Sequence, residues 1–181
     1  DQAISLAESL LAENTKDEVA LEILTVIDLL GQFEAGSTII ESETAENPVQ
    51  KRRFTMPHNG DWEDVLFMHP PASLSFSVEL PEEATKLRLR NALAPESWDW
   101  GGDGVTFVAT IAGQDQAPIE VYRQHISNET ADRDWHMAEI PLAQYAGETI
   151  TLTLATENGP QGDGTGDWAG WGSPRILFTS E

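Results

Sequence analysis

Cysteine is absent from this chain of 181 residues. Its absence excludes disulfide bonds, thiolate nucleophiles and cysteine-ligated metal centres, although it leaves the cellular compartment open. Stability must therefore come from a packed core, and a chain of this length can bury one as a single domain.

Basic residues are also scarce. Lysine and arginine together number 10 against 31 aspartate and glutamate residues, which gives a formal net charge of −21. Such a surface repels nucleic-acid phosphates and anionic lipids, so we expect no nucleic-acid partner. The acidity suits divalent cations, but a solvated acidic surface is the simpler interpretation.

Long hydrophobic runs are missing as well. A helix that spans a bilayer needs roughly 18 apolar residues in succession. The longest apolar stretch, residues 19–30, is interrupted by Glu22, Thr25 and Asp28. We therefore expect no membrane span within this chain.

The common catalytic motifs do not occur either. The chain has no Gly-x-Ser-x-Gly elbow and no His-Glu-x-x-His pair, and its 4 histidines are isolated. A glycosidase needs two carboxylates about 5–10 Å apart. Asp99 or Asp103 would form such a pair with Asp163 or Asp167 if their loops meet. Chance pairs are common in so acidic a chain, so we predict a non-catalytic protein.

Residues 1–31 differ in pattern from the rest of the chain. Apolar residues recur at helical spacing over residues 3–11 and 19–30, which predicts two short helices or one broken helix. The β-branched stretch 23–30 is also consistent with a strand. We expect a helical extension or spacer over residues 1–31, with an apolar stripe that needs a partner and offers a route to self-association.

From residue 32 onward, short alternating or apolar segments are separated by Gly, Pro, Asn and Asp clusters. Leu74, Phe76 and Val78, for example, share one face of a half-buried strand. No helical pattern lies between the segments, which argues against a parallel sheet. We predict a mostly β fold, an antiparallel jelly-roll β-sandwich over residues 32–181. The expected strands are residues 37–41, 65–68, 73–80, 86–91, 105–112, 119–126, 135–140, 150–156 and 176–178.

Tryptophan is concentrated in acidic, glycine-rich loops. Flat indole rings stack on the apolar face of a sugar, while neighbouring carboxylates accept hydrogen bonds from its hydroxyl groups. The alternative is that the rings close the ends of the sandwich, and Trp135 and Trp171 are the best candidates for that role. The residues predicted to bind a ligand are Trp98, Asp99, Trp100, Asp103 and Trp168.

The string Gly-Asp-Gly-Thr-Gly-Asp at residues 162–167 has oxygen-bearing side chains at alternate positions, as at the start of a calcium loop. Trp168 and Pro174 stand where an EF-hand requires glycine and glutamate, so this is not an EF-hand. A flexible surface loop and a calcium site remain alternatives.

Several strings together resemble the galactose-binding-like, jelly-roll carbohydrate-binding modules. They are Phe-Glu-Ala-Gly at residues 33–36, Gly-Asp-Gly-Val-x-Phe at 102–107, Leu-x-x-Tyr-Ala-Gly at 142–147, and Asp-x-Ala-Gly-Trp-Gly-x-Pro-Arg-Ile at 167–176. Such modules are appended to bacterial surface glycosyltransferases and glycoside hydrolases. The resemblance implies a structural Ca²⁺ with Glu34 as a ligand and places Asp167 in the C-terminal loop of the family pattern. Asp163 and Asp167 of the 162–167 string are the further candidate metal ligands.

The resemblance favours a non-catalytic carbohydrate-binding module of a larger extracytoplasmic protein, whether secreted, periplasmic or on the cell surface. The alternatives are a structural or protein-interaction domain without a sugar site and, third, a glycoside hydrolase. Exposed indoles would favour the first, and buried indoles with an apolar patch on residues 1–31 the second. Facing carboxylates in a deep cleft would favour the third.

Overall fold

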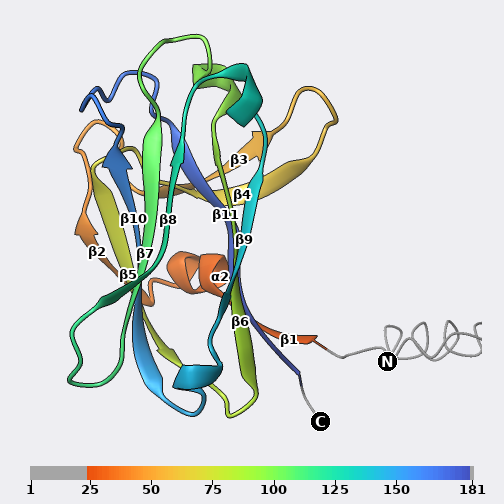
Figure 1. Ribbon diagram of the computed structural model, residues 1–181, viewed down its shortest axis with the longest axis vertical. Helices are drawn as coiled ribbons and strands as arrows, with labels where there is room; N and C mark the ends of the chain where they lie inside the picture. Colours follow the sequence, from red (N-terminus) through yellow and green to blue (C-terminus); the bar gives the residue numbers. More distant parts are fainter. Residues whose placement is uncertain (1–23, 180–181) are drawn as a thin grey trace, which may run out of the picture.

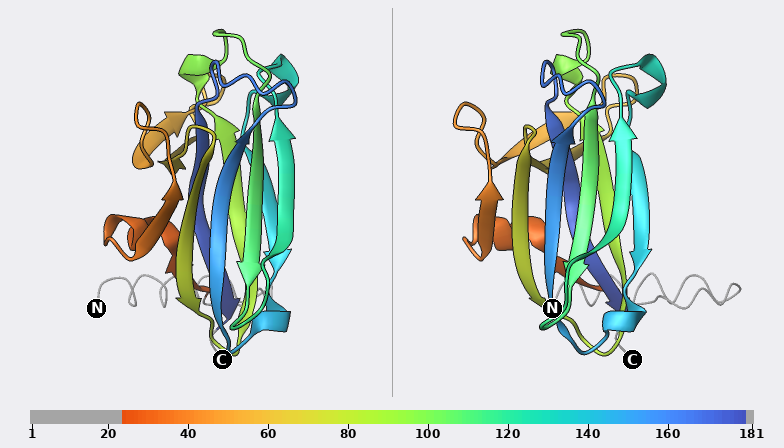
Figure 2. Two further views of the ribbon diagram at one scale, coloured as in Figure 1. Left: turned by 90° about the vertical axis from the view of Figure 1, so that its left-hand side faces the viewer. Right: turned by 60° about the vertical axis from the view of Figure 1, so that its left-hand side comes forward.

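The computed structural model describes residues 24–179, which form two antiparallel sheets packed face to face. Figures 1 and 2 show most strands running along the long axis, with loops gathered at both ends. The predicted mostly β sandwich is confirmed. Among the described residues, no helix is long and apolar enough to cross a bilayer.

The first sheet has 6 strands in the order β3-β4-β11-β6-β9, with β1 also paired to β11. All of its pairings are antiparallel. Its strands are β1 (Leu24–Asp28), β3 (Gln50–Thr55), β4 (Trp62–Phe67), β6 (Ala84–Leu93), β9 (His136–Pro141) and β11 (Ala169–Thr179).

The second sheet has 5 strands in the order β2-β5-β10-β7-β8, again antiparallel throughout. Its strands are β2 (Thr38–Ser42), β5 (Ala72–Glu79), β7 (Val105–Ala112), β8 (Ile119–Ile126) and β10 (Thr149–Asn158). The short helices within residues 24–179 are α2 (Leu29–Glu34), η1 (Pro95–Ser97), η2 (Thr130–Asp132) and η3 (Ala143–Tyr145).

The core lies between the sheets and is built from the inward residues of alternating strands. Trp171 of β11 is fully buried and meets the Phe107 ring of β7 edge-on at 5.0 Å. This contact confirms Trp171 as a packing residue. Trp135 packs elsewhere: its half-buried ring stacks on Phe54 of β3, in a smaller apolar cluster that also includes Val65 and Phe67.

The chain enters the first sheet earlier than expected. Residues 24–28, which the sequence assigned to a helical extension, form β1 and pair with β11. Asp28 then caps α2 by accepting a hydrogen bond from the Leu30 backbone N–H at 3.1 Å, and Leu29 and Leu30 are buried. The strand alternative for this stretch is therefore the right one over residues 24–28. The helices expected before residue 24 lie outside the described residues.

One strand was not predicted, and another was predicted too short. β3 was missed because its sequence, Gln-Lys-Arg-Arg-Phe-Thr, is polar, and at the edge of a sheet only Phe54 is buried. β11 was expected only at residues 176–178, because its first half is rich in glycine and contains proline. Gly170 is required there, since a Cβ at this position would lie 2.5 Å from the Phe54 ring.

Candidate functional site

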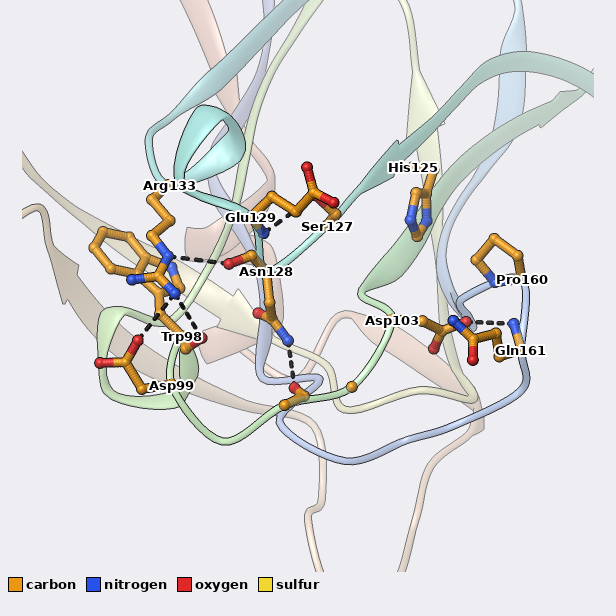
Figure 3. A pocket seen from close by; sticks show the side chains of 12 residues that line it. Trp98, Asp99, Asp103, His125, Ser127, Asn128, Glu129, Arg133, Pro160 and Gln161 are labelled. Carbon is orange, nitrogen blue, oxygen red and sulfur yellow. Dashed lines mark hydrogen bonds and ion pairs between the residues drawn. The ribbon is translucent and has the colours of Figure 1, made fainter.

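Three loops meet at one end of the sandwich, at the top of Figure 1. They join β6 to β7, β8 to β9, and β10 to β11. Together they enclose an open pocket of about 610 Å³, shown in Figure 3. Its lining residues are Trp98, Asp99, Gly101, Gly102, Asp103, His125, Ser127, Asn128, Glu129, Arg133, Pro160 and Gln161. We call this the end-loop pocket.

Glycines allow the loops to approach so closely. Gly102 and Gly104 have φ of 90° and 87°, a backbone conformation that favours glycine. A Cβ on Gly102 would lie 1.9 Å from the carbonyl oxygen of Thr165, and one on Gly104 would lie 2.1 Å from that of Ile126. The Gly-rich string thus leads into β7 and lies against the other two loops.

Arg133 holds one wall of the pocket together. Its guanidinium donates to the backbone carbonyls of Trp98 and Asn128, both at 3.0 Å, and pairs with Asp99 at 2.9 Å. Asn128 in turn donates its amide to the Gly101 carbonyl at 2.6 Å. In Figure 3 these contacts tie the β8–β9 loop to the β6–β7 loop. The amide oxygen of Asn128 is buried and has no hydrogen-bond partner among the described residues.

Trp98 forms the aromatic part of this wall. Its ring is half-buried against the main core, and its indole N–H donates to the Leu93 carbonyl at 3.2 Å. The Arg133 guanidinium lies 5.6 Å from the ring centroid. Trp98 therefore combines both roles considered from the sequence, since it packs against the core and also lines the pocket.

The opposite wall carries Asp103, His125, Pro160 and Gln161. One carboxylate oxygen of Asp103 accepts a hydrogen bond from the Gln161 backbone N–H. Its other oxygen, Oδ1, is buried and has no partner within residues 24–179. His125 lies beside Thr106, with its Nδ1 atom 3.4 Å from the threonine hydroxyl.

Asp167 lies beneath this wall and is fully buried. Neither of its carboxylate oxygens has a hydrogen-bond partner of normal geometry in the described part of the chain. Burial, followed by the nearby charges of Asp103 and Asp163, raises the pKa of Asp167 to about 7, and the Gly104 backbone N–H offsets this only in part. A buried, unpaired carboxylate next to further carboxylates is costly unless a proton or a cation balances it.

These carboxylates suit a hard cation such as Ca²⁺, which takes oxygen ligands. Asp103 and Asp167 contribute buried oxygens without partners, and the exposed Asp163 lies on the same loop as Asp167. Within residues 24–179, no three acidic or histidine side chains are grouped tightly enough to hold a metal alone. Backbone carbonyls or water would therefore have to complete the coordination.

Glu34, for which the resemblance implied a calcium role, is not part of this group. It ends α2, and its carboxylate pairs with Lys51 of β3 at 3.0 Å. Lys51 also lies 3.5 Å from Asp64, so Glu34 belongs to a surface ion-pair network on the first sheet.

The structure separates the five predicted ligand residues into two sets. Trp98, Asp99 and Asp103 line the end-loop pocket, whereas Trp100 and Trp168 do not. The rings of Trp100 and Trp168 meet edge-on at 4.8 Å. Trp168 also contacts Phe67 and lies under the Arg52 guanidinium, while Trp100 is 51% exposed. This pair is a separate aromatic surface.

Sequence reasoning missed the polar residues that complete the pocket, namely His125, Ser127, Asn128, Glu129, Arg133 and Gln161. The signal available was their position in Asn-, Ser- and Gly-rich stretches that end β8 and β10. Nothing in the order of residues shows that the two stretches face each other.

The paired carboxylates of the hydrolase hypothesis do meet, as Asp103 and Asp167. However, Asp167 has no exposed surface. A general acid must contact the glycosidic oxygen, and a sealed carboxyl group cannot. The raised pKa of Asp167 therefore reflects a buried cluster rather than an accessible catalytic acid.

No protein-family model matches the chain. An uncharacterized protein of Archaeoglobus fulgidus is 37% identical over 123 residues, which cover 63% of this chain and 30% of that protein. The chain thus spans less than a third of this relative.

Solved structures of carbohydrate-binding modules share the architecture. CBM51 from Clostridium perfringens GH95, in complex with methyl-galactose, aligns with a TM-score of 0.54 at 16% identity, over 84% of this chain and 99% of that chain. The tandem CBM51 modules of Sp3GH98 from Streptococcus pneumoniae give 0.56 at 9% identity, over 87% and 48%. CBM51-2 and INT domains of C. perfringens ZmpB, in complex with GlcNAc, give 0.51 at 12%, over 80% and 30%. The chain therefore has the β-sandwich fold of these modules.

Proposed function

We propose that this chain is a non-catalytic carbohydrate-binding module and that the end-loop pocket is its sugar site. The observation that carries the proposal is the pocket itself, in which an indole and opposed polar side chains converge at the loop end of the sandwich. Its volume of about 610 Å³ lies within the usual range for small-ligand sites.

The polar groups of the pocket suit neutral hydroxyl groups. Asp99, Asp103 and Glu129 supply carboxylates, against the single guanidinium of Arg133. The pocket therefore accepts hydrogen bonds more readily than it donates them, and it repels anions. Sugar hydroxyls both donate and accept hydrogen bonds, so they suit the carboxylates of this pocket as donors and its guanidinium as acceptors. We infer that the ligand is a neutral hexose or hexosamine.

The similar structures support this ligand class. One is a complex with methyl-galactose and another a complex with GlcNAc, both uncharged monosaccharides. Exposed indoles at Trp62 and Trp100, 53% and 51% accessible, favour a ligand-binding surface over a sealed structural domain. We place the module outside the cytoplasm, within a larger protein, because that is where a glycan partner would be met.

We further propose a structural Ca²⁺ beneath the pocket, held by Asp103 and Asp167 with Asp163 as a further candidate. Support comes from the buried carboxylate oxygens of Asp103 and Asp167 that lack partners in the described chain. Such an ion would neutralise the cluster and fix the β10–β11 loop against the β6–β7 loop. Its role would be structural, and no chemical step depends on it.

A glycan array followed by isothermal titration calorimetry tests the proposal. We expect binding to a neutral galactose- or N-acetylglucosamine-containing glycan, and at least a tenfold loss of affinity in Asn128→Ala. Glu120→Gln is the matched control, because Glu120 is an exposed residue of β8 that pairs with Arg123 and does not line the pocket. Equal affinities for Asn128→Ala and the wild type would exclude this pocket as the site.

A further inference from the structure

A second cavity, of about 410 Å³, lies on the outer face of the first sheet. It is formed by residues of β4, β6, β9 and β11 and shares no lining residue with the end-loop pocket. We call it the sheet-face cavity. Its charge differs from that of the rest of the molecule.

Three arginines line the sheet-face cavity, although the whole chain has only 10 basic residues. Two of them are neutralised by neighbours. Arg88 pairs with Glu139 at 2.8 Å, and Arg90 pairs with Asp61 and with Glu63, the latter at 2.7 Å. Among the arginines that line the cavity, only the third lacks such a carboxylate partner within the described residues.

That arginine is Arg175 of β11. Its Nε atom donates to the Ser173 carbonyl at 3.0 Å, and no carboxylate within residues 24–179 lies at ion-pair distance from it. Asp28 stands opposite in the β1–β11 register, but its carboxylate accepts the Leu30 N–H instead. As far as the described residues go, the two terminal nitrogens of Arg175 are therefore open to a ligand.

A β-bulge positions this guanidinium. The β6–β11 register shifts between Gly172 and Arg175, and Ser173 in between has a positive φ of 35°. The Ser173 hydroxyl donates to Glu63 at 2.5 Å, which holds the bulge against β4. Bulges of this kind redirect side chains, and strained backbone tends to be kept where a site needs it.

Apolar groups border the same cavity. Met137 is 66% exposed, and Trp135 lies over Gly172, where a Cβ would come within 2.9 Å of the ring. The half-buried Trp135 ring also contacts Phe54 and the Arg90 guanidinium, the latter 4.9 Å from its centroid, so only part of the ring faces the cavity. A bare inorganic anion would leave this surface without a contact. A ring that carries an acidic substituent would use the guanidinium and the apolar surface together.

We propose that the sheet-face cavity is a second saccharide site, specific for a carboxylate-bearing sugar of the uronic acid class. Arg175 binds the carboxylate through its two terminal nitrogens, and the sugar ring lies against the exposed Met137 and the part of Trp135 that faces the cavity. The carboxylate part of this inference rests on Arg175 alone, whereas the saccharide part rests on the proposed function. Because the chain as a whole is strongly acidic, we expect a weak dissociation constant, on the order of 1 mM.

Amide-shift mapping by NMR tests this assignment. Sodium D-galacturonate, methyl galactoside and sodium sulfate are titrated into the ¹⁵N-labelled chain at matched ionic strength. We expect galacturonate to shift the backbone amides of Gly172, Ser173 and Arg175, and Arg175→Gln to weaken that binding at least tenfold. Arg123→Gln is the charge-matched control, because Arg123 lies on the second sheet and pairs with Glu120 and Glu157.

Several results would count against a uronic acid site in the sheet-face cavity. No shift at β11, or unchanged binding in Arg175→Gln, overturns the site. Equal shifts with sulfate at the same concentration overturn the saccharide assignment. If Arg175→Gln is poorly folded, Arg175→Lys retains the charge without the planar fork, and unchanged affinity in that variant also counts against the proposal. Asn128→Ala must leave galacturonate binding intact, which separates this site from the end-loop pocket.

Discussion

At the scale of single residues, Arg133 connects the two loops that form one wall of the end-loop pocket. It bonds two backbone carbonyls and the Asp99 carboxylate and lies near the Trp98 ring. Its side chain is partly shielded from solvent, so these contacts are worth more than those of an ordinary surface ion pair.

We predict that Arg133→Ala lowers the free energy of unfolding by about 1–3 kcal/mol and abolishes sugar binding, because Trp98 and Asn128 lose their common anchor. Urea denaturation and calorimetry measure the two effects. Arg123→Ala removes an exposed arginine from its ion pairs and should lower the free energy of unfolding far less than Arg133→Ala does. Comparable losses in the two variants would refute the anchoring role.

Asp167 gives a pH-dependent prediction. Its pKa in the folded chain is about 7, above the ordinary value of 3.8, so the folded state holds the proton more tightly than the unfolded state. In EDTA, the stability that this proton provides is complete below about pH 4 and is lost as the pH rises to about 7, by at most about 4 kcal/mol. Asp167→Asn should remove this dependence and exceed the wild type in Tm at pH 8.

Calcium should make the wild type the protein with the higher Tm, whereas Asp167→Asn has the higher Tm in EDTA. At pH 8, millimolar CaCl₂ should raise the wild-type Tm by several degrees and leave Asp167→Asn unchanged, because binding to the folded state stabilises it. Differential scanning fluorimetry with MgCl₂ as the comparison measures this. A wild-type Tm that does not respond to calcium would remove the structural ion from the account.

The sequence predicted part of the pocket at this scale. Trp98, Asp99 and Asp103 stand out because indoles and carboxylates are informative residue types in loops. Arg133 and Asn128 do not stand out, since their role comes from a contact between loops that are about thirty residues apart in the chain. The ion pair of Glu34 with Lys51 could not be predicted either, because the Phe-Glu-Ala-Gly string does not show which side chain of a distant strand lies beside it.

At the scale of elements, the turn into β7 sets the floor of the pocket. Gly101 and Gly104 share a φ of 87°, but only Gly104 is pressed against another backbone, where a Cβ would lie 2.1 Å from the Ile126 carbonyl. The two positions therefore separate the cost of the backbone conformation from the cost of the steric overlap.

We predict that Gly101→Ala costs about 1 kcal/mol and that Gly104→Ala costs at least about 2 kcal/mol more, because β7 and the β8–β9 loop must move apart. Equilibrium unfolding in urea measures the difference. Equal stability of the two alanine variants would show that Gly104 is not in close contact with the Ile126 carbonyl.

The first elements of the chain should be integral to the sandwich. Leu29 of α2 is fully buried in the main core, so Leu29→Ala should cost about 2–5 kcal/mol. Ile39→Ala on β2, where the side chain is 64% exposed, should cost under about 1 kcal/mol. A mild effect of Leu29→Ala in thermal unfolding would mean that α2 contributes little to the core.

Most strands were predictable because alternation is a local property of a half-buried strand. β7 and β8 have the predicted limits, residues 105–112 and 119–126. β1 and β3 were not predictable in the same way. β1 has the period of a helix in sequence, and β3 is an edge strand whose polar residues conceal its pairing.

At the scale of the whole molecule, the sandwich separates two environments for ligands. The end-loop pocket is acidic and suits neutral hydroxyl groups, whereas the sheet-face cavity holds an arginine without a carboxylate partner among the described residues. The order of residues predicts the layers and their antiparallel pairing, but it cannot predict which loops converge at one end. The site therefore becomes visible only in three dimensions.

The central claim is that the end-loop pocket binds a neutral sugar. Its most direct test is amide-shift mapping of the ¹⁵N-labelled chain during titration with methyl galactoside and, separately, N-acetylglucosamine. The account predicts that at least one of them shifts Gly101, Gly102, Asn128 and Gln161 most strongly, on both walls of the pocket. It would be contradicted if neither sugar shifted these amides, or if the largest shifts fell on Trp100 and Trp168 instead.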